Sequence, residues 1–189
     1  MKLIAGLGNP GISYQETRHN VGWRALDLLV NHYQAGSFHE QKVFQGLLAE
    51  GRIGSEKILF LKPLTFMNAS GESLIAVKQF YKFDLNDILI FQDEMDFAPG
   101  TLALLAEGGA AGHNGIQSIQ DRLGTKQLHR VRIGIGHPIP PQAKEDYVLG
   151  RCSDEEEDLM KTAFGHIPRM VEDWVMQGID KTPKTWNGV

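Results

Sequence analysis

The chain has 189 residues, 42% of them hydrophobic, which predicts one domain over residues 1–189 with a full-sized core. A formal net charge of -4 argues against nucleic-acid binding through bulk positive charge, and the single cysteine, Cys152, excludes an intramolecular disulfide. No apolar run approaches the roughly 20 residues that span a bilayer, and the N-terminus lacks a signal-peptide core, so we expect a cytoplasmic protein.

An apolar strand over residues 2–7 begins the chain. The glycines at positions 6, 8 and 11 fit the dinucleotide-binding pattern G-x-G-x-x-G. However, Pro10 has no N–H to offer a phosphate, and the loop runs on to His19 instead of directly entering a helix. A dinucleotide domain would also end a second strand with an acidic residue about 20 residues later, whereas Asp27 falls inside a predicted helix. The run therefore predicts a tight turn that presents the amide of Asn9, followed by a histidine at a helix entrance.

Strands and helices then alternate. The pattern predicts a helix over residues 21–33, a hairpin of strands 44–53 and 57–61, a helix after residue 65, strands 87–91 and 101–105, a helix over 116–123, a strand 131–136 and a final helix from 153 to about 177, interrupted near Pro168. The second helix has Leu74, Val77, Phe80 and Tyr81 on its apolar face, and Ser153 with Glu156 forms a capping box for the last one. This order predicts a single-domain three-layer α/β sandwich with a mixed, mostly parallel central sheet and helices on both faces.

Polar side chains follow the predicted strands, at the end where open α/β sheets bind ligands. They are Asn9, His19, Asn68, Asp93, His113 and Asn114, with Met67 beside Asn68. His19 with Asp93 fits a general base and the carboxylate that orients it, which predicts attack of water on an acyl carbon. The asparagine amides predict a substrate rich in carbonyl and amide groups. The remaining histidines are scattered without a ligand pattern, so we expect no metal site.

Each of these residues also has a purely structural interpretation. A histidine at a helix start is more often a cap, an aspartate after a strand often caps a turn, and Asn114 before Gly115 is an ordinary turn signal. Their joint placement at strand ends favours a site. An amidase or esterase for small acylated substrates would fit the same residues.

The motifs GLGNPG, TRHNVG, TFMNASG, DEMD and GHNG, with HRVRIGIGHP at residues 129–138 and YVLG at 147–150, closely resemble bacterial peptidyl-tRNA hydrolases over essentially the whole chain. The resemblance implies hydrolysis of the ester between a peptide and the 3′-terminal ribose of tRNA, by a monomer without metal or organic cofactor. It implies that His19 is the base and Asp93 its orienting partner. By the same resemblance, the peptide and the 3′ end are bound by Asn9, Asn68 and Asn114, the cleft is walled by Tyr14 and Met67, and a tRNA phosphate is met by Arg132.

The chain departs from this family at the positions of Ala103, Leu105 and Glu107, among which relatives commonly place a lysine or arginine. Either the phosphate contact is weaker or another basic residue replaces it, the candidates being Arg122, Lys126, Arg130 and Lys144. We expect a shallow salt dependence of tRNA affinity. A catalytically inactive RNA-binding offshoot is the alternative function, although the intact pair of His19 and Asp93 argues against it. The sequence leaves open whether His113 supports Asn114 or only packs.

Overall fold

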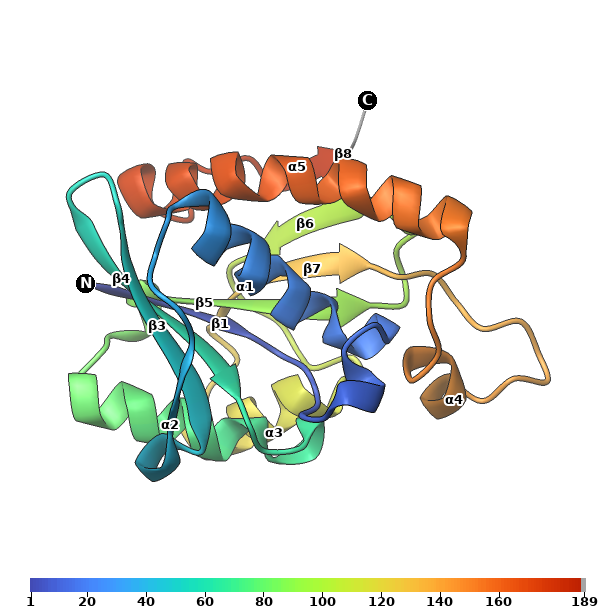
Figure 1. The fold of residues 1–189 in the computed structure, drawn as a ribbon, viewed down its shortest axis with the longest axis horizontal. Coiled ribbons are helices and arrows are strands. Elements are labelled where there is room, and N and C mark those ends of the chain that lie inside the picture. Colours follow the sequence, from blue (N-terminus) through green and yellow to red (C-terminus); the bar gives the residue numbers. More distant parts are fainter. Residues whose placement is uncertain (188–189) are drawn as a thin grey trace.

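An eight-stranded sheet between two layers of helices forms the molecule in the computed structural model, which describes residues 1–187 (Figure 1). Across the sheet the strands follow the order β2-β3-β4-β1-β5-β7-β6-β8. Their bounds are Lys2–Gly6 (β1), His39–Gln41 (β2), Gly46–Ile53 (β3), Glu56–Pro63 (β4), Ile88–Glu94 (β5), Thr101–Leu105 (β6), His129–Gly134 (β7) and Thr185–Asn187 (β8). The predicted α/β sandwich with a mixed sheet is confirmed.

The prediction that the sheet is mostly parallel is wrong. Over residues 1–187, β1 pairs in parallel with β4 and β5, and β5 with β7, whereas the four other pairings are antiparallel. The connection from β5 to β6, residues 95–100, is too short for the crossover of about a dozen residues that a parallel strand requires. β6 therefore runs opposite to β5 and β7, and only the central four strands are parallel.

Two helices cover each face of the sheet (Figure 1). α1 (Val21–His32) and α5 (Asp154–Gln177) close one hydrophobic cluster, which includes Trp174, and α2 (Ser70–Tyr81) and α3 (Asn114–Leu123) close the other. The short α4 (Lys144–Val148) lies beyond the carboxyl ends of β5 and β7 (Figure 1). The starts of α3 and α4 thus flank the edge of the sheet where a site was predicted.

α5 begins at the predicted capping box, in which Ser153 and Glu156 exchange side-chain and backbone hydrogen bonds. The predicted interruption at Pro168 is wrong, because the helix continues through it. The flanking Ile167 and Met170 are fully buried, and Tyr33 Oη donates a hydrogen bond to the Pro168 carbonyl, so tertiary contacts hold the helix together there. No helix in residues 1–187 combines the length and the hydropathy that crossing a membrane requires.

Two residues of α2, Phe80 and Gly71, do not fit what is expected of an amphipathic helix. Phe80, predicted on the apolar face, is 68% exposed and contacts Phe44 and Tyr81 only at the rim of the core. Gly71, a poor helix former, stands where α2 touches α3, and a Cβ there would overlap the carbonyl oxygen of Ser118. The glycine therefore permits the close approach of the two helices.

Candidate active site

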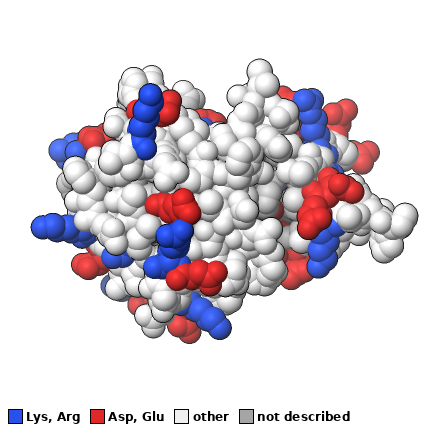
Figure 2. Space-filling view, turned by 90° about the horizontal axis from the view of Figure 1, so that it is seen from below, with Lys and Arg blue, Asp and Glu red and all other residues white. Residues whose placement is uncertain are grey.

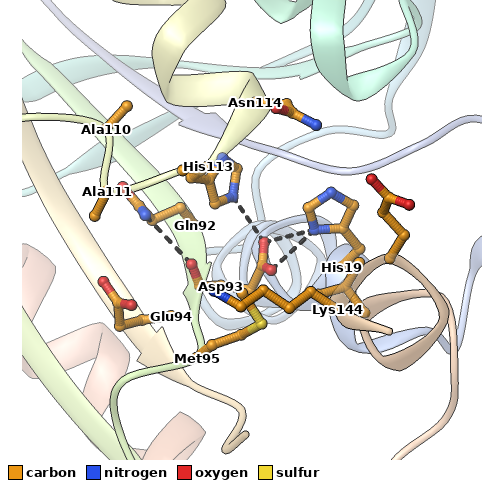
Figure 3. Close-up of a pocket in the computed structure, with 13 residues that line it drawn as sticks. His19, Gln92, Asp93, Glu94, Met95, Ala110, Ala111, His113, Asn114 and Lys144 are labelled. Carbon is orange, nitrogen blue, oxygen red and sulfur yellow. Dashed lines mark hydrogen bonds and ion pairs between the residues drawn. The ribbon is translucent and has the colours of Figure 1, made fainter. Parts of the chain in front are cut away.

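A pocket opens at the carboxyl end of β5, between the start of α3 and the helix α4 (Figure 3). Its walls come from four segments that are distant in sequence: the 3-10 helix Arg18–Asn20, the end of β5, the loop 110–114 and α4. The side chains that line it include His19, Asp93, Glu94, His113, Asn114 and Lys144. Three predicted site residues, His19, Asp93 and Asn114, thus meet at the expected edge of the sheet.

The loop after β1 packs against α1, and this contact accounts for two of the glycines of the G-x-G-x-x-G pattern. A Cβ at position 6 would overlap the carbonyl oxygen of Gly22, and a Cβ at position 8 would lie 2.7 Å from the Trp23 ring. These glycines allow the backbone to approach another element closely, as glycines do in such loops. The approach brings the loop beside the 3-10 helix that carries His19.

Arg18, which the sequence analysis did not single out, anchors that 3-10 helix. Its guanidinium pairs with Glu156 at 2.7 Å and stacks 4.2 Å above the centre of the Tyr147 ring. Its backbone N–H also donates to the carbonyl of Gly150 at 2.9 Å. The residue before His19 is therefore fixed to α4 and to the start of α5, which limits the positions that the imidazole can take.

His19 and Asp93 form the predicted pair. His19 Nδ1 lies 2.9 Å from both carboxylate oxygens of Asp93, whose side chain is 4% exposed. Because a carboxylate only accepts hydrogen bonds, Nδ1 carries the proton and Nε2 keeps a lone pair. Figure 3 shows Nε2 on the side of the ring away from Asp93, toward Asn114. The imidazole is thus arranged to accept a proton from a group in the pocket.

His113 is a second partner of the same carboxylate, at 2.8 Å from Nε2 to Asp93 Oδ1. Its Nδ1 accepts the backbone N–H groups of Gly115 and Ile116 and caps α3. An acceptor at Nδ1 leaves the proton of the neutral ring on Nε2, which donates it to Asp93. His113 therefore supports Asp93, a role other than the two that the sequence suggested, which were support of Asn114 and packing alone.

This arrangement shifts both pKa values of the pair. Burial lowers the pKa of His19, but the charge of Asp93 and its hydrogen bond raise it, and the net pKa lies above 6.5. Burial raises the pKa of Asp93, but His19 and His113 outweigh it and bring the pKa well below the usual 3.8. Asp93 is consequently ionised throughout the neutral range, and His19 gains its proton more readily than a free histidine.

His19, Asp93 and His113 also have the composition of a metal site, since their ligand atoms all lie within 4.8 Å of one another. The hydrogen bonds decide against that use in this conformation. His113 Nε2 must carry a proton as long as Nδ1 caps α3, so it has no lone pair for a cation. The cluster is better described as a carboxylate held between two N–H donors.

The predicted residues Asn9, Tyr14, Met67 and Asn68 are not among the residues that line the pocket. Asn9 Oδ1 accepts the backbone N–H of Met67 at 2.8 Å, and Met67 packs on the start of α3, where a Cβ at Gly115 would lie 2.6 Å from its sulfur. Asn68 follows Met67 and is exposed. Tyr14 makes an edge contact with Phe66, their ring centres 6.3 Å apart. Asn9, Met67 and the start of α3 are therefore linked by direct contacts.

His113 and Asn114 reach the pocket by a route that the strand-end rule did not anticipate. Because β6 is antiparallel to β7, it ends near Arg130, at the opposite edge of the sheet. The loop 106–113 then brings the chain back. The Arg130 guanidinium fixes this loop by donating hydrogen bonds to the carbonyls of Gly108 and Gly109 at 3.0 and 3.1 Å.

Arg132 lies next to the pocket in a neighbouring hollow. Its guanidinium stacks 4.5 Å from the centre of the Phe97 ring and lies 3.5 Å from Glu94, a residue that lines the pocket. The hollow is also lined by Ala103, one of the three positions where the resemblance led us to expect a basic residue, and by Lys184, which the sequence analysis did not consider. A second cation is thus present near Arg132, supplied by the C-terminal segment.

The four candidate replacements for the missing basic residue differ in availability. Arg130 is 2% exposed and donates to loop carbonyls, so the expectation that it could replace the missing basic residue is wrong. Arg122 pairs with Glu72 on the face formed by α2 and α3, where Lys and Arg lie among Asp and Glu (Figure 2). Lys126 lines a separate hollow between α3 and residues 109–110, whereas Lys144 lines the pocket that contains His19.

Comparison with known proteins agrees with this geometry. A family model described as peptidyl-tRNA hydrolase matches residues 3–189. The peptidyl-tRNA hydrolase of Syntrophomonas wolfei is 41% identical over 187 residues, covering 99% of this chain and 100% of that protein, and the one of Bacillus cytotoxicus is 43% identical over 93% of both. A crystal structure of peptidyl-tRNA hydrolase from Acinetobacter baumannii superposes with a TM-score of 0.87 at 35% identity, over 96% of this chain and 94% of that one.

Proposed function

This chain belongs to the peptidyl-tRNA hydrolase family and hydrolyses the ester bond between peptide and tRNA, and we propose that it does so with water activated by His19. The observation that carries this mechanism is the pair of His19 and Asp93. Nδ1 is fully engaged with a buried carboxylate, and Nε2 remains available on the other side of the ring. No side-chain nucleophile is needed.

In the proposed reaction, Nε2 accepts a proton from water while the water oxygen bonds to the ester carbonyl carbon. Asp93 stabilises the imidazolium that forms and keeps the ring in one orientation. Collapse of the tetrahedral intermediate breaks the bond to the ribose 3′ oxygen, which takes the proton back from Nε2. The products are a peptide with a free carboxylic acid, which ionises, and a tRNA with a 3′ hydroxyl.

The surrounding residues bind the substrate in this proposal. The amides of Asn9, Asn68 and Asn114 bind the carbonyl groups of the peptide end and the 3′-terminal nucleotide, and an amide N–H beside the reacting carbonyl stabilises its developing negative charge. Tyr14 and Met67 form the apolar wall. Arg132, in the neighbouring hollow, binds a phosphate of the tRNA acceptor end.

We further propose that the protein acts as a monomer, in the cytoplasm, without a metal or organic cofactor. In support of the monomer, His19, Asp93 and Asn114 line one pocket within a single chain. Equal turnover per chain over a wide range of protein concentrations, and retention of activity after dialysis against a chelator, are the results expected.

The central test is release of an N-blocked amino acid from tRNA by the unaltered protein and by His19→Ala. We expect His19→Ala to lose at least 100-fold in kcat, within the roughly 10²- to 10⁴-fold contribution of a general base. His137→Ala is a matched control, because His137 is an exposed histidine paired with an aspartate, Asp96, outside the pocket lining. Equal rates for the unaltered protein and His19→Ala would contradict the mechanism.

A further inference from the structure

Asn20, the residue after His19, makes an unusual use of its side chain. It stands at the N-cap position of α1, where an asparagine commonly accepts a hydrogen bond from the first turn, yet its side chain makes no capping bond. It is also fully buried, with 0% of its surface exposed. A buried amide needs partners, so its hydrogen bonds go elsewhere.

Both hydrogen bonds go to the backbone of Asn9. Asn20 Oδ1 accepts the Asn9 N–H at 2.9 Å, and Asn20 Nδ2 donates to the Asn9 carbonyl at 3.0 Å. The two bonds form a closed pair, as between neighbouring β-strands, and fix both the position and the rotation of this peptide segment. The loop after β1 is thereby attached to the residue adjacent to His19.

The same contacts determine which way the Asn9 amide faces. Its Oδ1 accepts the Met67 N–H at 2.8 Å, so the NH₂ group is the part that remains. Among residues 1–187, no group accepts a hydrogen bond from Asn9 Nδ2. Asn9 therefore keeps two donors for a ligand on a side chain whose backbone and oxygen are both fixed.

We propose that Asn20 is a positioning residue, which holds Asn9 against the start of α1 so that the Asn9 NH₂ group meets the substrate carbonyl at a fixed distance from His19. This inference rests on the proposed function of the site, in which Asn9 binds substrate. Asn20 itself touches no substrate. Asn20 thus sets the spacing between His19, in the 3-10 helix, and the Asn9 NH₂ group, in the loop after β1.

A double-mutant cycle on kcat/KM for an N-blocked aminoacyl-tRNA tests the proposal. Asn9→Ala removes the amide but keeps the backbone groups that Asn20 binds, so it isolates the side chain through which Asn20 acts. We expect Asn20→Ala to lower kcat/KM about 10- to 100-fold, because a shift of about 1 Å in a binding group can cost about 10²-fold. In the Asn9→Ala background the same change should cost less than about threefold. Losses that multiply in full, or an unchanged rate for Asn20→Ala alone, would overturn the proposal.

Two further measurements separate positioning from loss of folding or of His19. Asn20→Asp has nearly the same shape and keeps the acceptor for the Asn9 N–H, but it places an oxygen against the Asn9 carbonyl oxygen. This variant should therefore also lose activity. Thermal unfolding of each variant measures whether it remains folded. The acid limb of the pH profile should stay unchanged in both variants, because the hydrogen bonds of the Asn20 side chain go to the Asn9 backbone and not to the His19 ring or to Asp93. A shifted limb would mean that Asn20 acts on the base instead, which overturns the proposal. If His19→Ala is inactive but the Asn20 variants do not give these results, the proposed function is retained and the positioning role of Asn20 is rejected.

Discussion

Replacing Asp93 by asparagine is expected to inactivate the enzyme by a specific route, which the hydrogen bonds of the two histidines define. The substitution preserves shape but replaces one carboxylate oxygen with an NH₂ group. His113 donates from Nε2 because its Nδ1 caps α3, so the remaining amide oxygen turns to His113. The new NH₂ then takes the place of Oδ2, 2.9 Å from His19 Nδ1, and favours Nδ1 as an acceptor in competition with the retained oxygen, which lies at the same distance from Nδ1.

The consequence is a change of tautomer at His19. With Nδ1 as acceptor, the proton moves to Nε2, and the nitrogen that should accept a proton from water no longer has a lone pair. The loss should approach the whole contribution of the base, about 10²- to 10⁴-fold in kcat or roughly 3 to 5 kcal/mol of transition-state free energy. Asp93→Ala should lose less than Asp93→Asn, because it leaves the tautomer of His19 free.

Single-turnover hydrolysis of an N-blocked aminoacyl-tRNA measures this directly, with circular dichroism to confirm folding. The sharpest comparison adds His113→Ala to Asp93→Asn. Without His113, the amide can turn its oxygen to His19, and the double variant should recover part of the activity lost by Asp93→Asn. If Asp93→Ala is as inactive as Asp93→Asn and removing His113 restores nothing, the tautomer argument is refuted.

Three other outcomes follow from single features. The kcat/KM should fall as pH decreases through a value above 6.5, because only neutral His19 accepts a proton and its pKa is raised; a limb at or below 6.5 in the pH profile would contradict this. Gly71→Ala should lower the free energy of unfolding by about 1 to 3 kcal/mol through overlap with Ser118, measured in urea, whereas Gly165→Ala in open space should raise it by up to about 1 kcal/mol. Binding of tRNA should weaken with salt at a slope of only one to three, and Arg132→Gln should reduce the slope by about one; a slope near that of many phosphate contacts would argue against so few cations.

Periodicity could predict most helices and central strands because each buries one face against the sheet. It could not predict β2, β8 or α4, which have three to five residues each and are too short to repeat a pattern. The direction of β6 differs from the prediction for another reason. Strand direction depends on the length of the preceding connection, and the alternation of strands and helices does not reflect that length.

In the candidate site, too, the sequence could predict which residues lie together at strand ends but not the contacts between residues of different segments. His19, Asp93 and Asn114 could be placed together because strand ends converge in an open sheet, although Asn114 arrives by a returning loop. Asn20 could not be recognised, because an asparagine at a helix start is so often a cap that the sequence gives no reason to look for another use. Only the contact with the Asn9 backbone distinguishes the two uses.

The orientation of the catalytic pair depends on a bond that lies outside it. Asp93 is fixed between two histidines, but only one of them can be the base, and the start of α3 selects which one. The N–H groups of Gly115 and Ile116 occupy His113 Nδ1, so this ring can only donate to Asp93 and has no free lone pair. His19, with no such cap on its ring, keeps Nε2 for the reaction. A helix N-terminus thus assigns different roles to two histidines that bind the same carboxylate.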